Sequence, residues 1–424
     1  MSLAEQVRQA ALPLESAADL GPLLRRMGDA RVVMLGEATH GTREFYALRA
    51  ALTERLIAEH GFSFVAVEGD WPDCKRVDRH VKGQEGDDAA RTLRAFARWP
   101  TWMWANEEVA ELAAWMRGWN EGHPLEPVGF FGLDVYSLWD SMEEVVRYLE
   151  ERDPEAAGAA REAYACFGPY MRDEHAYAAS TRWIPESCES EVVAVLARIA
   201  ERGVVDERDF DAEQNAFVAA NAEAYYRAMV RNDADSWNVR DRHMMETLDR
   251  LLRAHGPRSK AVVWAHNTHV GDARATDMAR AGMVNLGQLA RERYGMDDTF
   301  AVGFGTHRGT VVAGRSWGAR MEEMRVPPAV SGSWEDVMHE ATEGHDALFL
   351  LRGAREPEWR ALRGHRAIGV VYDPAWESPG NYVPTDLPGR YDAFVHLDAT
   401  HALRPLHAPV AGGREPPETF PSGM

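Results

Sequence analysis

The chain has 424 residues, 45% hydrophobic and 27% charged, so it is long enough for one large domain or two to three ordinary ones. Its formal net charge of −20 and the lack of a long Lys/Arg cluster argue against nucleic acid as a partner and disfavour a strongly anionic substrate. No apolar run approaches the roughly 20 residues that cross a bilayer, and no signal peptide is evident, so we expect a cytoplasmic protein without a membrane partner.

The three cysteines, Cys74, Cys166 and Cys188, are far apart and form no CxxC pair. This spacing favours neither a disulfide framework nor a thiolate zinc site. We therefore expect free thiols in a reducing compartment.

Several short runs rich in Val, Phe and Ile are predicted to be strands. Continuous apolar runs are typical of strands that are covered on both faces of a sheet. In chain order they span 30–38, 63–71, 127–135, 260–269, 299–307, 346–351, 367–373 and 391–398.

Helical patterns lie between the early runs. One follows Thr42, a plausible N-cap, and ends at Gly61, a plausible C-cap; another covers 107–122. Strand–helix alternation predicts an α/β fold with a central, largely parallel or mixed sheet flanked by helices.

From residue 137 to 255 the strand signal vanishes and amphipathic helices follow one another. We interpret 137–255 as a helical insertion that caps the active-site cleft. Residues 1–136 and 256–410 then form the two parts of the α/β core, and the Pro/Gly-rich residues 411–424 form a flexible tail.

Acids and histidines end the predicted strands. Because ligands bind beyond the carboxyl ends of strands in open α/β sheets, parallel neighbours would gather these side chains into one cleft. Carboxylates with imidazoles are typical of a general-base or metal site. The residues, in chain order, are Glu37, His40, Glu68, Asp70, Asp134, His266, His269 and His307.

His40 is the natural base at neutral pH, and a carboxylate that holds its ring would stabilise the imidazolium. Glu37 and Glu68 are both candidates for that carboxylate. No GxSxG nucleophile elbow occurs, so the base would activate water directly. The backbone N–H groups of Gly41 and Thr42 begin the next helix and would hold an oxyanion.

Three of the polar residues also have plain structural interpretations. Asp70 precedes Trp-Pro and fits a turn or cap residue, and His307 before Arg-Gly fits a turn histidine. Arg49 fits a surface residue that snorkels, although it could instead reach a carboxylate in the cleft.

The chain resembles the erythromycin esterase family, in particular its bacterial erythromycin esterase-like and succinoglycan-biosynthesis-like branch. The resemblance rests on "GEATHGTREF", "FVAVEGDWPD", "WPTWMWAN", "FGLDVYSLWDS", "SWNVRDRHMM" and "VVWAHNTHVGD", in this order. It is specific over 30–306 and weaker towards residue 406.

The resemblance implies an α/β core with a helical insertion and a hydrolase that cleaves a small-molecule carboxylic ester or lactone, without a nucleic-acid or membrane partner. Macrolide antibiotics, and hence antibiotic resistance, are associated with the family, but "GEATHGT" is typical of the broader branch. The catalytic residues that it implies are His40, Glu37, Glu68, His266, His269 and Arg49. Arg240, Asp134 and Trp104 are the expected substrate-binding residues.

Three alternatives stay open. A divalent metal at His266, His269 and Glu68 would make the hydrolase metal-dependent, whereas the first hypothesis needs no cofactor. A biosynthetic enzyme could transfer the acyl group or close a ring with the same base. The many tryptophans would also suit a protein that only binds a small molecule, although they equally suit core packing. The sequence gives no indication of the oligomeric state.

Overall fold

The computed structural model describes residues 2–170, 172–183, 187–230 and 234–409. Its strands are β1 (Leu12–Pro13), β2 (Val32–Leu35), β3 (Phe64–Asp70), β4 (Gly129–Asp134), β5 (Ala261–Trp264), β6 (Thr299–Gly314), β7 (Met321–Val326), β8 (Ala347–Leu350), β9 (Arg363–Arg366), β10 (Tyr382–Thr385) and β11 (Ala393–Thr400).

The α-helices are α1 (Leu3–Ala10), α2 (Gly21–Met27), α3 (Arg43–His60), α4 (Trp71–Val81), α5 (Ala89–Leu93), α6 (Glu107–Gly122), α7 (Leu138–Arg152), α8 (Pro154–Tyr164), α9 (Glu174–Ser180), α10 (Glu189–Arg202), α11 (Glu207–Met229), α12 (Ala234–Ala254), α13 (Asn267–Val270), α14 (Leu286–Tyr294), α15 (Trp334–Thr342), α16 (Glu377–Gly380) and α17 (Leu387–Arg390). Short 3₁₀ helices are η1 (Ala17–Leu20), η2 (Thr101–Met103), η3 (Ala165–Tyr170), η4 (Ala273–Ala275) and η5 (Met278–Ala281).

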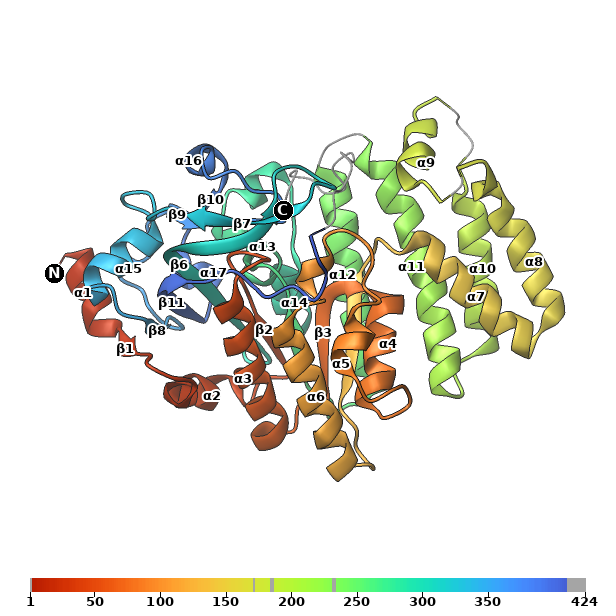
Figure 1. Cartoon of the computed structure of the whole chain (residues 1–424), viewed down its shortest axis with the longest axis horizontal. Helices are drawn as coiled ribbons and strands as arrows, with labels where there is room; N and C mark the ends of the chain where they lie inside the picture. The colour runs from red at the N-terminus through yellow and green to blue at the C-terminus, as the bar shows by residue number, and fades with distance from the viewer. Residues whose placement is uncertain (1, 171, 184–186, 231–233, 410–424) are drawn as a thin grey trace.

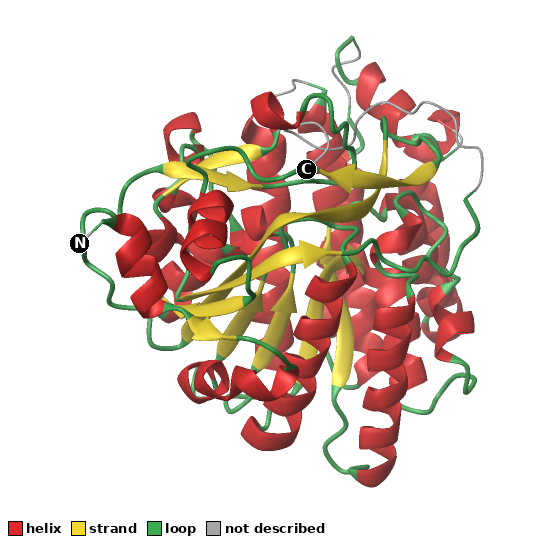
Figure 2. Cartoon of the chain, turned by 60° about the vertical axis from the view of Figure 1, so that its left-hand side comes forward, coloured by secondary structure: helices red, strands yellow, loops and turns green. Residues whose placement is uncertain are grey.

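A nine-stranded, mostly parallel sheet forms the centre, so the predicted α/β class is confirmed. Its order is β1-β8-β11-β6-β2-β5-β3-β4, with β7 paired to β6. Figure 2 shows the strands in yellow between the helices in red. The strands from β11 to β4 pair in parallel, whereas β1, β8 and β7 pair antiparallel. The carboxyl ends of β2, β5, β3 and β4 therefore lie side by side.

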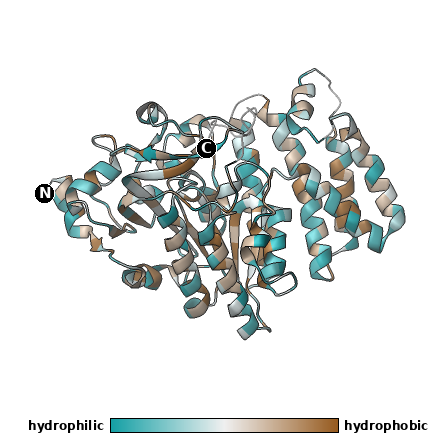
Figure 3. Ribbon diagram, viewed as in Figure 1, coloured by the Kyte–Doolittle hydropathy of each residue, from teal (hydrophilic) through white to brown (hydrophobic). Residues whose placement is uncertain are grey.

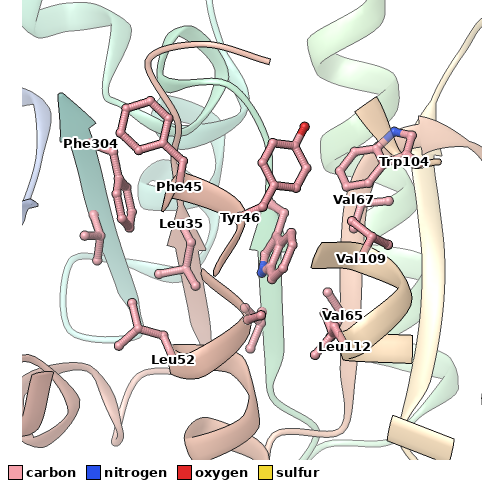
Figure 4. Packing of buried hydrophobic residues seen from close by; sticks show 14 of the residues in the cluster. Leu35, Phe45, Tyr46, Leu52, Val65, Val67, Trp104, Val109, Leu112 and Phe304 are labelled. Atoms are coloured by element: carbon pink, nitrogen blue, oxygen red, sulfur yellow. The ribbon is translucent and has the colours of Figure 1, made fainter. Parts of the chain in front are cut away.

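Helices cover both faces of the sheet, which explains why its strands are continuous apolar runs. Val33 and Leu35 of β2 pack towards α3 and α6, and Val32 and Met34 pack on the opposite side with α12 and α14. Figure 4 shows the first of these layers, in which Leu35, Phe45 and Phe304 lie together. In α3, Gly61 ends the helix at φ +67°, as its C-cap role requires.

The helices α7 to α11 form a bundle beside the core, and α12 returns the chain to the sheet (Figure 1). This bundle has an apolar core of its own, which includes Leu138, Val145, Phe167 and Tyr226. Figure 3 shows hydrophilic and hydrophobic residues on the same helices of this bundle.

Some predicted strand limits are wrong. The run 260–269 ends as a strand at Trp264, because His266 caps the short helix α13. Residues 367–373 form only isolated bridges, and the neighbouring strand is β9. β6 continues to Gly314, so His307 lies inside a strand and not in a turn.

No helix in the described part of the chain combines the length and the apolar character that a membrane span requires. The tail 411–424, which the sequence predicts to be flexible, lies outside the described residues.

Candidate active site

The candidate site lies where four parallel strands end next to one another. Glu37 follows β2, His266 follows β5, Glu68 lies in β3, and Asp134 ends β4. All four side chains are buried, with at most 4% of the side chain of each acid exposed. The sheet order thus brings together residues that are far apart in the sequence.

His40 is held by Glu37, and Glu37 by Arg49. The Glu37 Oε1 atom lies 2.8 Å from His40 Nδ1, and Arg49 Nη2 donates to Glu37 Oε2 at 2.6 Å. The Arg49 guanidinium is fully buried and lies over the rings of Tyr46 (4.3 Å) and Trp264 (4.5 Å). Because a carboxylate only accepts, we assign the proton of neutral His40 to Nδ1, which leaves the Nε2 lone pair available.

Glu68 faces that lone pair. Its Oε1 atom lies 4.0 Å from His40 Nε2 and accepts from Arg240 Nη2 at 2.7 Å, and its Oε2 accepts from the His266 backbone N–H at 2.8 Å. Burial acts to raise the pKa of Glu68, but His269 and Arg240 outweigh it and hold the pKa well below the ordinary value. Glu68 is therefore an anion at neutral pH.

Arg240 joins the helical insertion to the sheet. From α12 it donates to both oxygens of Asp134, through Nε at 2.9 Å and Nη2 at 2.7 Å, and to Glu68. A fork of this kind fixes the guanidinium plane. Trp104 adds a further restraint, since its Nε1–H donates to the Glu68 carbonyl at 3.0 Å.

His269 faces Glu68 from the other side. Its Nε2 lies 3.4 Å from Glu68 Oε1, and its Nδ1 lies 2.9 and 3.0 Å from the two oxygens of Asp241. The ring of Trp237 stacks flat on the imidazole at 4.6 Å. Burial opposes protonation, but Asp241 and Glu68 outweigh it and raise the pKa of His269 to about 9.

His266 has a different environment. Its Nδ1 accepts from the Thr268 backbone N–H as the cap of α13, and its ring lies 4.9 Å from that of His40. Burial, assisted by His40, holds the pKa of His266 well below the ordinary value. The imidazole is therefore neutral, and it is not among the side chains that line the cavity described next.

A cavity of about 80 Å³ reaches His40, Glu68, Asp134 and Arg240. Its remaining walls are mainly apolar, with five aromatic and three charged residues. They consist of Gly69, Asp70, Asp73, Phe96, Arg98, Trp99, Pro100, Met103, Trp104, Tyr136, Trp317 and Val370.

The remaining predicted residues fall in different places. Asp70 lies in the cavity wall, 3.5 Å from Arg98. His307 stacks on His339 at 3.8 Å and is not part of this cavity. The backbone N–H of Gly41 donates to Thr39 Oγ1 at 3.3 Å, so it is already engaged in a contact that the sequence did not predict.

Sequence reasoning missed several site residues. Asp241 directly follows Arg240 in "SWNVRD", and Trp237 precedes it by one helical turn, so the helical spacing could have indicated that they share a face. Tyr136, Trp99 and Trp317 carry no comparable signal, since aromatic side chains at such positions are as typical of a core.

The proposed metal ligands are already engaged with protein groups. His266 Nδ1 faces Thr268, and His269 Nδ1 faces Asp241. Arg240 donates to Glu68 where a cation would bind. Within the described ranges no three His, Cys, Asp or Glu side chains are grouped so as to hold a metal ion.

The expectation of free cysteines is wrong for two of the three. Cys166 and Cys188 form a disulfide in the helical insertion, and Cys74 is free and buried. Helical packing brings together two cysteines that are 22 residues apart, which their spacing alone did not indicate. The disulfide removes one support for a reducing compartment, and the cytoplasmic location stays a prediction.

Comparison with known proteins agrees with the resemblance of the motifs. A model of the erythromycin esterase family matches residues 57–400, a range that begins after His40. The chain is 24% identical to erythromycin esterase type II of Escherichia coli over 353 residues, which cover 77% of this chain and 82% of that protein.

Two solved structures have the same fold. A succinoglycan biosynthesis protein superposes with a TM-score of 0.78 at 20% identity, over 95% of this chain and 97% of that one. A mutant of the erythromycin esterase EreC in its open conformation superposes with a TM-score of 0.69 at 18% identity, over 93% and 97%.

Proposed function

The chain belongs to the erythromycin esterase family, which supports a hydrolase in general, and from this we propose that it cleaves a carboxylic ester or lactone with water that His40 activates. One observation carries the proposal. His40 and Glu68 both line the cavity, His40 Nε2 lies 4.0 Å from Glu68 Oε1, and Glu37 holds His40 Nδ1. This is the arrangement of a general base with an orienting carboxylate.

The gap between His40 and Glu68 suits the attacking water. The His40 Nε2 and Glu68 Oε1 atoms are 4.0 Å apart, too far for a direct hydrogen bond. One water molecule can lie within hydrogen-bond distance of two atoms at that separation. Glu68 would orient this water, and His40 would accept its proton.

The reaction would then proceed in two steps. The water oxygen attacks the carbonyl carbon as its proton passes to His40 Nε2, and the C=O electron pair moves onto the oxygen. When the tetrahedral intermediate collapses, the bond to the alcohol oxygen breaks and the imidazolium returns the proton to it. The carboxylates of Glu37 and Glu68 stabilise the imidazolium between these steps, and the guanidinium groups of Arg98 and Arg240 in the cavity wall favour the oxyanion.

The walls of the cavity favour an apolar substrate. Trp99, Trp104, Tyr136 and Trp317 supply flat aromatic surface, and the nearby carboxylates disfavour an anion. A small ester or lactone of apolar character is therefore the substrate class that we propose, and a macrolide is one lactone to include in the test.

The test is hydrolysis of a panel of chromogenic esters, small lactones and a macrolide in ¹⁸O-labelled water. We expect one ¹⁸O atom in the carboxylate product of at least one substrate. Product esters formed with an added alcohol, without ¹⁸O incorporation, would instead show an acyl-transferring enzyme. Tight binding without any turnover would show a binding protein.

A further inference from the structure

Two imidazoles share one carboxylate oxygen in this site. His40 and His269 both direct Nε2 at Glu68 Oε1, at 4.0 and 3.4 Å, and each has its Nδ1 on another buried carboxylate, Glu37 or Asp241. The two His–carboxylate pairs thus have the same arrangement, with Nδ1 on their own carboxylate and Nε2 towards Glu68.

Access distinguishes the two pairs. His40 lines the cavity, whereas His269 is fully buried, is covered by Trp237 and is not among the lining residues. A substrate in the cavity can therefore meet His40 but not His269. The second pair needs a role other than proton exchange with the substrate.

The charges around His269 indicate that role. Asp241 and Glu68 face the two nitrogens of the imidazole, although burial raises the pKa of the Asp241 carboxyl. Arg240 Nη1 lies 3.2 Å from Nε2; because a guanidinium only donates, this contact is a hydrogen bond when Nε2 is unprotonated and a contact between two cations when it is protonated. The two carboxylates outweigh Arg240 and raise the pKa of His269 to about 9, so the ring is an imidazolium at neutral pH. With Arg240, it supplies the positive charge that keeps Glu68 ionised.

We infer that Asp241 is a positioning residue of the proposed reaction, which holds His269 as a permanent imidazolium so that Glu68 stays an oriented anion beside His40. When His40 is protonated, the site is a row of alternating charge: Arg49, Glu37, His40, Glu68, His269 and Asp241. His40 is the one member that changes charge during turnover. This inference rests on the proposed function.

The position of Asp241 is itself well defined. It is fully buried on α12, and its Oδ1 also accepts from the Leu286 backbone N–H at 2.8 Å, at the start of α14. Trp237, Arg240 and Asp241 have helical spacing, so one face of α12 holds His269 and Glu68 together.

The first test needs no substrate. In protein labelled with ¹⁵N-histidine, the His269 signals are identified by their loss in His269→Gln. We expect imidazolium shifts at pH 7.5 in the wild type, and a His269 pKa lower by at least about one unit in Asp241→Asn. A neutral His269 in the wild type at pH 7.5 would overturn the inference.

The second test follows kcat/KM against pH for an ester that the wild type hydrolyses. Asp241→Asn should lower kcat/KM at least about 10-fold and move its acid limb to higher pH, because Glu68 loses the imidazolium that keeps it ionised. Asp241→Glu should partly restore both. An unchanged pH profile in Asp241→Asn would contradict the inference.

Asp398→Asn is the matched control, because it removes the carboxylate of another His–carboxylate pair, His339–Asp398, that does not face Glu68. It should leave the His269 signals and the pH profile unchanged. Failure of the proposed function has a different signature, namely that His40→Ala keeps its activity whatever the result for Asp241.

Discussion

His40 and His269 show how the surroundings of a side chain decide its chemistry. Both are buried imidazoles with a carboxylate on Nδ1 and with Nε2 towards Glu68. In our account only His40 exchanges protons with the substrate, because the cavity reaches it. Asp241 and Glu68 raise the pKa of His269 to about 9, and Trp237 stacks on its ring.

Glu37→Gln tests the first pair. The amide would keep the size of the side chain but remove the charge that stabilises the His40 imidazolium, and it would leave Arg49 without its anion. We expect kcat to fall by about 10²- to 10⁴-fold with little change in KM. Glu59→Gln, at the exposed end of α3, is the control and should behave as the wild type. Equal activity of both variants would show that Glu37 does not assist the base.

The stability that His269 contributes should depend on pH. Its pKa rises from 6.5 to about 9 on folding, so the protonated ring stabilises the native state fully below pH 6.5. This contribution is lost as the pH rises through 9. The difference in unfolding free energy between the wild type and His269→Gln should therefore be larger at pH 6.5 than at pH 9.5 in urea titrations. The same difference at both pH values would contradict a charged His269.

For single residues, the sequence indicated which residue types end the strands, but not which side chains they contact. Glu37 and His40 could be predicted because both follow one apolar run. The contact of His269 with Asp241 could not, because it depends on how α12 packs against α13 and α14. Arg49 had a surface interpretation until the fold placed Tyr46 and Trp264 around it.

Among the elements, the helical insertion contributes to the site through few residues. Arg240 of α12 reaches the sheet, and Tyr226 of α11 donates to the Tyr136 carbonyl at 3.1 Å in the cavity wall. Arg98 donates to the same Tyr226 hydroxyl at 2.8 Å. The bundle thus contacts the wall of the cavity without supplying the base.

Tyr226→Phe should therefore alter substrate choice more than catalysis. Without the hydroxyl, Arg98 and Tyr136 lose a shared partner, and the wall that they form is less defined. We expect KM to change by several-fold for bulky esters while kcat for a small ester stays within about twofold. A steady-state comparison of an acetate with a bulky aryl ester measures this. Parallel losses of kcat for both would contradict a role limited to the wall.

The disulfide between Cys166 and Cys188 should stabilise the insertion. It closes a loop between residues 22 apart within the apolar core of the bundle. Cross-links of this length typically contribute about 3 kcal/mol to the free energy of unfolding. Cys188→Ser should lower the unfolding temperature in calorimetry, and a reductant should lower that of the wild type but not of the variant. If reductant left the wild type unchanged, the cross-link would not stabilise the fold.

Elements with strong periodicity could be predicted, and those set by tertiary contacts could not. The helix after Thr42 and the helix 107–122 were found almost to their ends. The strand β7 was missed because its exposed Glu322, Glu323 and Arg325 leave no continuous apolar run in the sequence. It forms a strand through its antiparallel pairing with β6. The apolar run 367–373 is mostly buried in the core, but it forms only isolated bridges and no continuous strand.

In the whole molecule, the sheet order explains why residues that are far apart in the sequence lie around one cavity. β2 lies between β5 and β6, so the residues after β2 meet those after β5. The sequence predicted a mostly parallel sheet, since apolar runs alternate with helices. Strand order could not be predicted, because pairing across the insertion depends on packing of the complete chain.

The protein as a whole should act without a metal ion. Arg240 and the His269 imidazolium supply the positive charge next to Glu68. Dialysis against a chelator should leave ester hydrolysis unchanged within about twofold, as measured beside metal analysis of the same sample. Loss of activity that zinc or manganese restores would contradict this account and favour the metal-dependent hydrolase.

The most direct test of His40 as the base is kcat/KM for the best ester of the panel in wild type, His40→Ala and His401→Ala. His401 is exposed at the surface and serves as the control. We predict that His40→Ala loses at least about 10³-fold in kcat/KM, with an unchanged circular dichroism spectrum and unfolding temperature, while His401→Ala matches the wild type. A folded His40→Ala variant that hydrolyses the ester at the wild-type rate would contradict the account.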